Sequence, residues 1–176
     1  MKILLNNRVC FLLSGILLTF MLADSAQAQT EKEVVKIRAE AAAINKGAAK
    51  YTKTTKNVEG ISLEGTEVTY YRSAGNLRKI TAKMSGETYN AAGEFYYRDG
   101  QLIFAFLKHN RYDTQIGLDK PPKVVDVEER RFYFADGDLI RLLVGKKELK
   151  SGGARYDELQ NSIVDISGKL KNSNKD

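Results

Sequence analysis

The sequence of 176 residues has few of the side chains on which metal sites and many enzymes depend. It contains one histidine, one cysteine, two prolines and no tryptophan. Common zinc sites use three or four histidine or cysteine ligands, which His109 and Cys10 cannot supply. The same scarcity excludes a disulfide within the chain and limits Ser-His or Cys-His catalysis to His109. We therefore expect no metal and no cofactor.

Carboxylates that could perform acid–base chemistry are present, but each has a simpler explanation. Glu94, Glu128 and Glu129 could form a carboxylate pair for glycoside hydrolysis. All three lie beside arginines in segments that we expect to be strands, where cross-strand ion pairs account for them. Asp136 and Asp138 resemble the start of a calcium loop, but the distal glutamate of such a loop is missing. We therefore predict that the protein is not an enzyme.

The N-terminal segment has the pattern of a cleavable export signal. Lys2 and Arg8 precede an apolar run from Val9 to Leu22, and Ala26-Gln27-Ala28 is the small-x-small pattern that precedes signal cleavage. The run falls short of the roughly 20 residues needed to span a bilayer, so we expect no transmembrane anchor after signal removal. We predict three parts in a periplasmic or secreted protein: a signal peptide at 1–28, a single α+β domain at 29–170 and a flexible tail at 171–176.

The charge balance limits the partners. Lysine and arginine exceed aspartate and glutamate by 28 to 22, a net charge of +6 that is scattered along the chain. Nucleic acid is not an expected partner of an exported chain whose basic residues form no single stripe. A protein or a cell-envelope polymer is expected instead, and an anionic surface is one option.

Two amphipathic helices flank the middle of the chain. Within Glu31–Tyr51, apolar residues recur at steps of three and four, which places them on one helix face. These residues are Val34, Ile37, Ala41, Ile44, Ala48 and Tyr51. The second series follows the break at Ser151-Gly152-Gly153 and consists of Tyr156, Leu159, Ile163, Ile166 and Leu170.

The middle of the chain carries an internal repeat. The segment 95–103 returns as 132–140, and a looser copy at 70–77, interpreted as holding one extra residue before its glycine, favours a three-residue loop there. Asp-Gly between apolar runs is a strong hairpin signal, because a type I′ turn needs positive φ at both central residues. We predict six antiparallel strands, at roughly 66–72, 76–84, 88–98, 101–109, 125–135 and 138–145.

The hairpins give the predicted sheet two apolar faces. Phe95 and Phe132 fall on one face, together with Tyr97 and Phe134, and Tyr70, Tyr96 and Tyr133 fall on the other. A sheet that is apolar on both faces cannot leave either in water. The predicted fold is an α+β, six-stranded antiparallel meander built from three hairpins, strongly curved or barrel-like, with both amphipathic helices packed on it. The segment 111–123, which holds both prolines, is predicted to be a loop that serves as a crossover or a binding element.

These features favour an exported, non-catalytic binding or interaction module. Its predicted contact residues are Tyr70, Arg78, Tyr96, Arg131 and Tyr133. Tyrosine and arginine combine a large contact area with a hydrogen-bonding end, which recognition surfaces favour. The alternative is a carrier of a small apolar ligand, with a pocket inside the curved sheet. A filled core with the tyrosines and arginines left exposed would favour the module, and a void lined by phenylalanines would favour the carrier.

Overall fold

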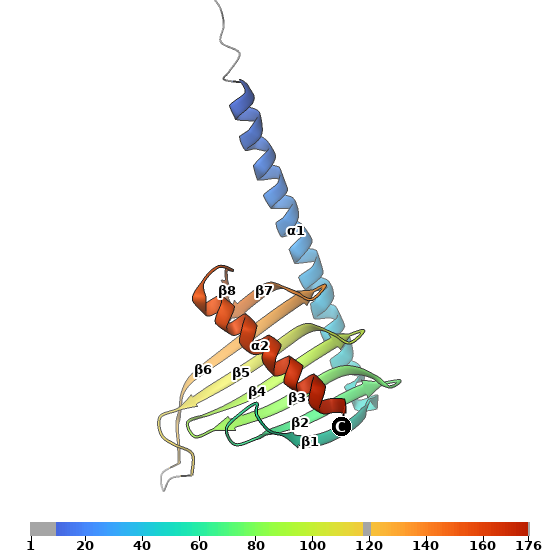
Figure 1. Cartoon of the computed structure of the whole chain (residues 1–176), viewed down its shortest axis with the longest axis vertical. Coiled ribbons are helices and arrows are strands. Elements are labelled where there is room, and N and C mark those ends of the chain that lie inside the picture. Colours follow the sequence, from blue (N-terminus) through green and yellow to red (C-terminus); the bar gives the residue numbers. More distant parts are fainter. Residues whose placement is uncertain (1–9, 118–120, 176) are drawn as a thin grey trace, which may run out of the picture.

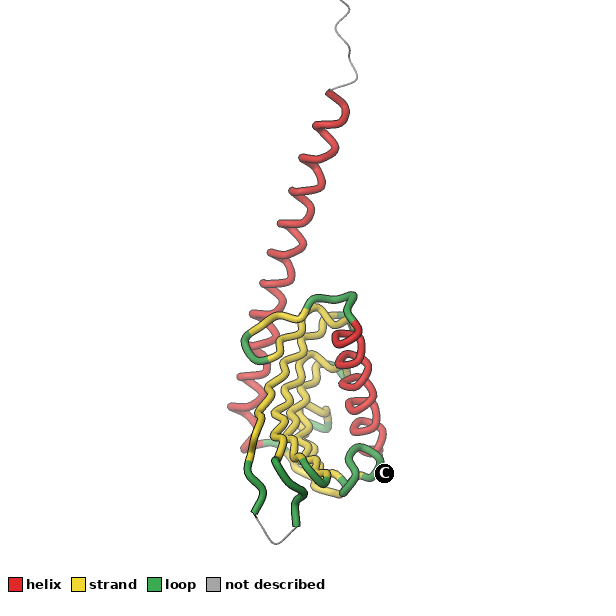
Figure 2. Tube along the Cα trace, turned by 90° about the vertical axis from the view of Figure 1, so that its left-hand side faces the viewer, coloured by secondary structure: helices red, strands yellow, loops and turns green. Residues whose placement is uncertain are grey.

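The computed structural model describes residues 10–117 and 121–175. In these segments one antiparallel sheet lies between two long helices, as Figure 2 shows. The helices are α1 (Cys10–Gly47) and α2 (Ala154–Asn172), followed by the 3₁₀ turns η1 (Ala48–Lys50) and η2 (Ser173–Lys175), respectively. The strands are β1 (Thr52–Val58), β2 (Thr66–Ser73), β3 (Asn76–Gly86), β4 (Tyr89–Arg98), β5 (Gln101–Tyr112), β6 (Val124–Ala135), β7 (Asp138–Val144) and β8 (Lys147–Leu149).

The sheet is an open meander in which each strand pairs antiparallel with the next, in the order β1 to β8 (Figure 1). The predicted α+β class is confirmed. The predicted count of six strands is wrong, because the described residues form eight, and the sheet is not closed into a barrel. The sequence hides β1 because that strand is rich in threonine and lysine and mostly exposed, without apolar alternation. It hides β8 because that strand has only three residues.

The three predicted turns are present, with positive φ at both central residues of each. In the second and third hairpins φ is 49° at Asp99, 77° at Gly100, 52° at Asp136 and 92° at Gly137. The first hairpin turns in the same way, at Ala74-Gly75. The longer loop expected there is wrong, because Ser73 pairs directly with Asn76.

A β-bulge recurs at the same place in all three hairpins. The register shifts between Tyr71 and Arg72, between Tyr96 and Tyr97, and between Tyr133 and Phe134. The returning strand therefore carries one extra residue each time: Arg78, Ile103 and Ile140. Side chains of these residues lie against α1, where Arg78 bonds to Glu40 and the two isoleucines join apolar clusters. The bulges thus direct one additional side chain from each hairpin towards α1.

The core between the sheet and α2 is filled with side chains. Buried residues of α2 pack against aromatic rings of the second and third hairpins. The rings of Phe95, Tyr97 and Phe132 are at most 1% exposed. The predicted spacing of the C-terminal helix is confirmed, with Tyr156, Leu159, Ile163 and Leu170 all buried.

On the opposite face, α1 crosses the sheet near the three turns. Its buried residues Val34, Ile37, Ala41 and Ile44 follow the predicted spacing. They pack against Tyr96, Ile103 and Tyr133 and their apolar neighbours. The helix ends at Gly47 and not at Tyr51, and it begins at Cys10, so its N-terminal part projects beyond the sheet (Figure 1).

Both ends of the chain can be compared with the predicted boundaries of the signal peptide and the tail. The segment predicted as a tail from residue 171 is helical as far as Lys175, and Arg72 donates to the Asn174 side chain at 2.5 Å. The signal peptide stays a prediction: residues 1–9 lie outside the described residues, and the rest of it belongs to α1. Neither helix in the described segments combines the length and the apolar composition that a membrane-spanning helix needs.

Candidate binding surface

The three tyrosines predicted to contact a partner are buried. Tyr96 and Tyr133 are 1% and 2% exposed on the α1 side, and Tyr70 is 1% exposed on the α2 side. The expectation that all three share a face is wrong for Tyr70. Counted back from the turn glycine, Tyr70 is equivalent to Phe95, while Tyr71 is equivalent to Tyr96 and Tyr133. The supposed extra residue in the first copy caused this error.

The two arginines of the predicted site lie apart. Arg78 binds Glu40 of α1 at 3.2 Å, and it does not lie across from Tyr70, whose partner in the register is Ile80. Arg131 lies on β6, pairs with Glu129 at 2.6 Å and stacks over a neighbouring phenylalanine. The structure therefore does not bring the five predicted residues to one surface. Binding through them stays a prediction, and the burial of the tyrosines weighs against it.

A closed set of hydrogen bonds surrounds Tyr96. Asn45 of α1 donates its side-chain N–H to the Tyr96 hydroxyl at 2.8 Å, and that hydroxyl donates to Glu94. Lys79 donates to the Asn45 carbonyl at 2.8 Å and pairs with Glu94 at 3.2 Å. Burial, together with the Glu94 carboxylate, raises the pKa of Tyr96 well above its usual range. These bonds tie α1 to the sheet and keep the hydroxyl protonated.

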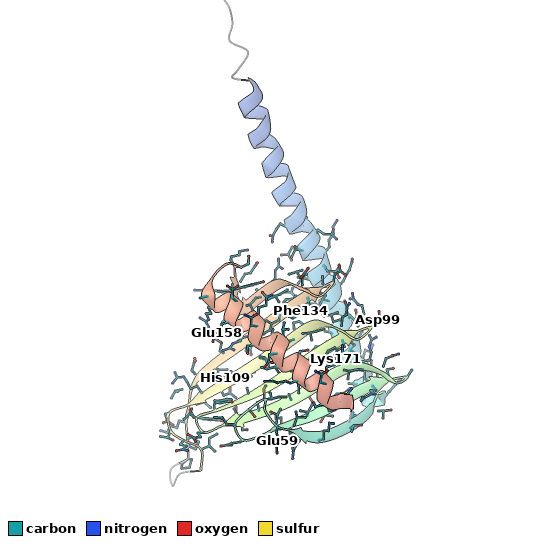
Figure 3. All side chains as sticks on the ribbon, viewed as in Figure 1. Glu59, Asp99, His109, Phe134, Glu158 and Lys171 are labelled. Atoms are coloured by element: carbon teal, nitrogen blue, oxygen red, sulfur yellow. The ribbon has the colours of Figure 1, made fainter. Side chains whose placement is uncertain are left out.

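His109 occupies a half-buried position on β5, at the strand end far from Asp99 (Figure 3). Its ring stacks on Tyr89 with centroids 5.0 Å apart. Burial and the positive charge of Arg130 lower the pKa of His109 below its ordinary value. The imidazole is therefore neutral over a wide pH range and packed against an aromatic ring.

The candidate catalytic carboxylates of β6 are bound to arginines. Glu128 accepts hydrogen bonds from Arg130 and Arg155, each at 2.5 Å. Burial acts to raise the pKa of Glu128, but the hydrogen bonds and charges of the two arginines prevail and lower it. Glu129 binds Arg131. Across the described ranges, no group of three or more histidine, cysteine, aspartate or glutamate residues could hold a metal ion.

The β5–β6 hairpin projects beyond the other strand ends, at the lower left of Figure 1. At its base, the Asp113 N–H donates to the Lys123 carbonyl, so the predicted 111–123 loop is shorter than expected, at 113–123. Three valines at the start of β6 are exposed. Val124 is 51% exposed, and Val125 and Val127 are each 50% exposed. This set, Val124, Val125 and Val127, is called the valine patch below.

The valine patch lies on a strand segment with one open edge. β7 pairs with β6 only from Arg130 to Ala135, and the Gly145 N–H donates to the Glu129 carbonyl at 2.7 Å. From Val124 to Glu128, β6 pairs with β5 on one side, with a bulge that leaves Val125 without a register partner, and it meets no strand on the other side among the described residues. Backbone groups of successive strand residues point to alternate sides. The N–H and C=O of Val127 therefore point to the open side, as the Glu129 carbonyl does.

The sequence prediction missed the valine patch. A signal was present, because three valines within four positions follow the only prolines of the chain. Such a run predicts a strand, which was expected from residue 125. The open edge of this strand could not be predicted, because it depends on β7 ending opposite Arg130.

Several hollows lie elsewhere on the described surface. One, of about 770 Å³, is formed by the loop between β1 and β2 together with β3 and includes the exposed Leu63. Another, of about 300 Å³, lies between α2 and two hairpin turns. Its apolar lining comes from Tyr97, Leu102, Phe134 and Val164.

The described chain is thus an α+β protein with an open eight-stranded antiparallel meander and one helix on each face. Compared with known protein families, curated proteins and solved structures, it matches none. Its function must therefore be inferred from its own residues and surface.

Proposed function

We propose that the protein is an exported, non-catalytic binding or interaction module that acts in the periplasm or outside the cell. Its contact element is the β5–β6 hairpin. The observation that carries this proposal is the valine patch, in which three apolar side chains stand about half exposed on a projecting element. Clustered apolar surface of this kind is stabilised when a partner removes it from water.

The titratable residues support binding over chemistry. A general acid or base must reach the proton that it transfers. His109 is stacked on Tyr89, and Glu128 and Glu129 are bound to arginines. These contacts account for the three groups as parts of the sheet, which favours a non-catalytic role.

Export is supported by the position of the helix contacts. The predicted cleavage follows Ala28, and the first described ion pair between α1 and the sheet joins Glu31 to Arg141 at 2.7 Å. Among the α1 residues whose burial is described, which begin at residue 27, the first buried one is Val34. Cleavage at the predicted point would therefore leave these contacts of α1 intact.

The partner that fits the hairpin best is a protein. Valine has no side-chain hydrogen-bonding group, so a polar cell-envelope polymer would lose solvation against it without compensation. A protein surface can supply matching apolar side chains. A protein is therefore favoured over a polymer.

A small-ligand carrier remains the second candidate, supported by the hollow of about 300 Å³ beside α2. Its volume is at the lower end for ligand pockets, and its apolar lining suits a small apolar molecule. The filled core weighs against a carrier pocket inside the sheet, because rings occupy the space of the predicted void. Replacing Val164 with tryptophan would fill the hollow and abolish ligand uptake by a carrier.

Photo-crosslinking in the native host tests the proposed function. A photoreactive amino acid is placed at Val125 in one variant and at Val164 of α2 in another. These two valines are 50% and 51% exposed, so they form a matched pair. We expect a defined protein adduct from position 125 and none from position 164. The same adducts from both positions, or none from either, would contradict a contact role for the hairpin.

A further inference from the structure

We propose that the open edge of β6 binds an extended segment of the partner protein as an added strand. In that segment a basic side chain faces Asp126, flanked by apolar residues next to Val125 and Val127. This inference rests on the proposed function, because it specifies how the hairpin contacts its partner. When a strand is added to a sheet edge, backbone hydrogen bonds provide the affinity, and contacts of alternate side chains provide the specificity.

The backbone of the open edge is available for pairing. Val127 directs its N–H and C=O away from β5, and no described strand lies on that side. The neighbouring position along the edge, Glu129, already shows the pairing geometry, because its carbonyl accepts the Gly145 N–H. An added strand would continue this line of hydrogen bonds beyond the end of β7.

The charges along the edge specify the partner's central residue. Glu128 and Glu129 are held by arginines of the same chain. Asp126 is exposed and forms no ion pair among the described residues, although Arg111 lies opposite it in the register. Asp126 is thus the acidic residue of this edge that an incoming cation can pair with. Opposite charges directly across two strands stabilise their pairing.

A second copy of the chain fits this edge poorly. If the β6 edges of two copies paired antiparallel around a two-fold axis at Val127, Asp126 of each copy would lie opposite Glu128 of the other. A shift of the axis by one residue would set Asp126 opposite Asp126, or Glu128 opposite Glu128. Like charges directly opposite each other destabilise a strand pair. The edge therefore favours a different chain that carries a basic residue.

The test uses the full chain and two short peptides followed by NMR. One peptide has a central lysine flanked by valines, and its matched control has glutamate in that place. We expect the lysine peptide to slow amide exchange at Val127 and to bind about fivefold more tightly than the glutamate peptide. Asp126→Lys should reverse this preference. Equal binding of both peptides to both proteins would overturn the proposal.

A backbone variant tests strand pairing separately from charge. Val127→Pro removes the N–H that faces the open side, and proline is tolerated on edge strands with this orientation. We expect it to weaken binding of the lysine peptide at least tenfold, whereas Val127→Thr, which keeps the N–H, should not. Equal binding by the two variants would contradict strand addition. If Val127→Pro does not fold, the charge reversal at Asp126 still decides the proposal.

The outcomes separate this inference from the proposed function. If Val127→Pro keeps the crosslink at position 125, the hairpin binds through side chains, so strand addition fails while the proposed function stands. If no crosslink forms with the parent chain, the proposed function itself fails. A dimer in sedimentation that Val127→Pro dissolves would show that a second copy occupies the edge, which would overturn the choice of partner.

Discussion

Tyr71, Tyr96 and Tyr133 occupy the same position in the three hairpin copies, yet their hydroxyl groups meet different surroundings. Tyr96 bonds to Asn45 and Glu94, and Tyr133 accepts a hydrogen bond from Arg38 at 3.1 Å. The Tyr71 ring lies under a lysine ammonium, and its hydroxyl has no hydrogen bond in the described segments. The difference arises because α1 packs over the second and third hairpins.

The first prediction compares Tyr96→Phe with Tyr71→Phe. Loss of the Tyr96 hydroxyl removes its bonds to Asn45 and Glu94, so we expect the free energy of unfolding to fall by about 1 kcal/mol. Tyr71→Phe should change it by less than about 0.5 kcal/mol. Urea denaturation measures both variants. Equal effects would show that the Tyr96 bonds do not stabilise the fold.

His109 is the only histidine, so NMR can follow its titration without overlap. Burial and Arg130 should hold its pKa in the folded protein below 6.5. Because the folded pKa is depressed, the resulting stability is fully present above pH 6.5 and is lost as pH falls through the folded pKa.

Arg130→Gln removes one of these causes and should raise the pKa of His109, whereas Lys108→Gln should leave it nearly unchanged. A titration midpoint above 6.5 in the parent chain would refute this account of the site.

At the scale of elements, replacing glycine with alanine should have opposite effects on stability in a hairpin turn and in α2. Gly137 has a φ of 92°, where an added methyl group is strained, so Gly137→Ala should destabilise the protein by about 1 kcal/mol. Gly168 lies inside α2 with nothing within 4 Å of an added Cβ, so Gly168→Ala should stabilise it by up to about 1 kcal/mol. Thermal unfolding measures both changes. If both variants shift the melting temperature in the same direction, either the turn conformation at Gly137 or the helical position of Gly168 is wrong.

Turns and helices could be predicted because each depends on a local pattern. Asp-Gly indicates the positive φ that a tight hairpin needs, and apolar steps of three and four indicate a helix face. The bulges could not be predicted, because the extra residue has no characteristic side chain: it is Arg78 in one copy and isoleucine in the others. One unseen bulge reverses the faces of the residues beyond it, which is why Leu142 packs towards α2 and not with Ile140.

The candidate site was less predictable than the fold. Tyr96 and Tyr133 were placed on the correct face, but the sequence does not show that α1 buries them. The valine patch is visible in the sequence only as a strand. Its open edge depends on the length of a strand that follows it in the chain. A site that depends on where a neighbouring strand ends can therefore be identified only from the structure.

At the scale of the whole molecule, the sheet and its two helices account for the described part of the chain, and the N-terminal part of α1 projects from it. We predict that export removes residues 1–28, because the cleavage pattern ends at Ala28 and the described ion pairs and buried residues of α1 begin at Glu31. Intact mass spectrometry of the exported protein should show a chain that begins at Gln29. A mature protein that keeps residues 1–28 would disprove the signal assignment.

The central claim is that the β5–β6 hairpin is the surface through which this protein binds another protein. The most direct measurement is amide hydrogen exchange of the full chain, with and without the purified partner that crosslinks at position 125. We predict that slowed exchange concentrates in Val124–Glu129 and is strongest at Val127. Slowed exchange centred on the α2 hollow, with residues 124–129 unchanged, would contradict the claim.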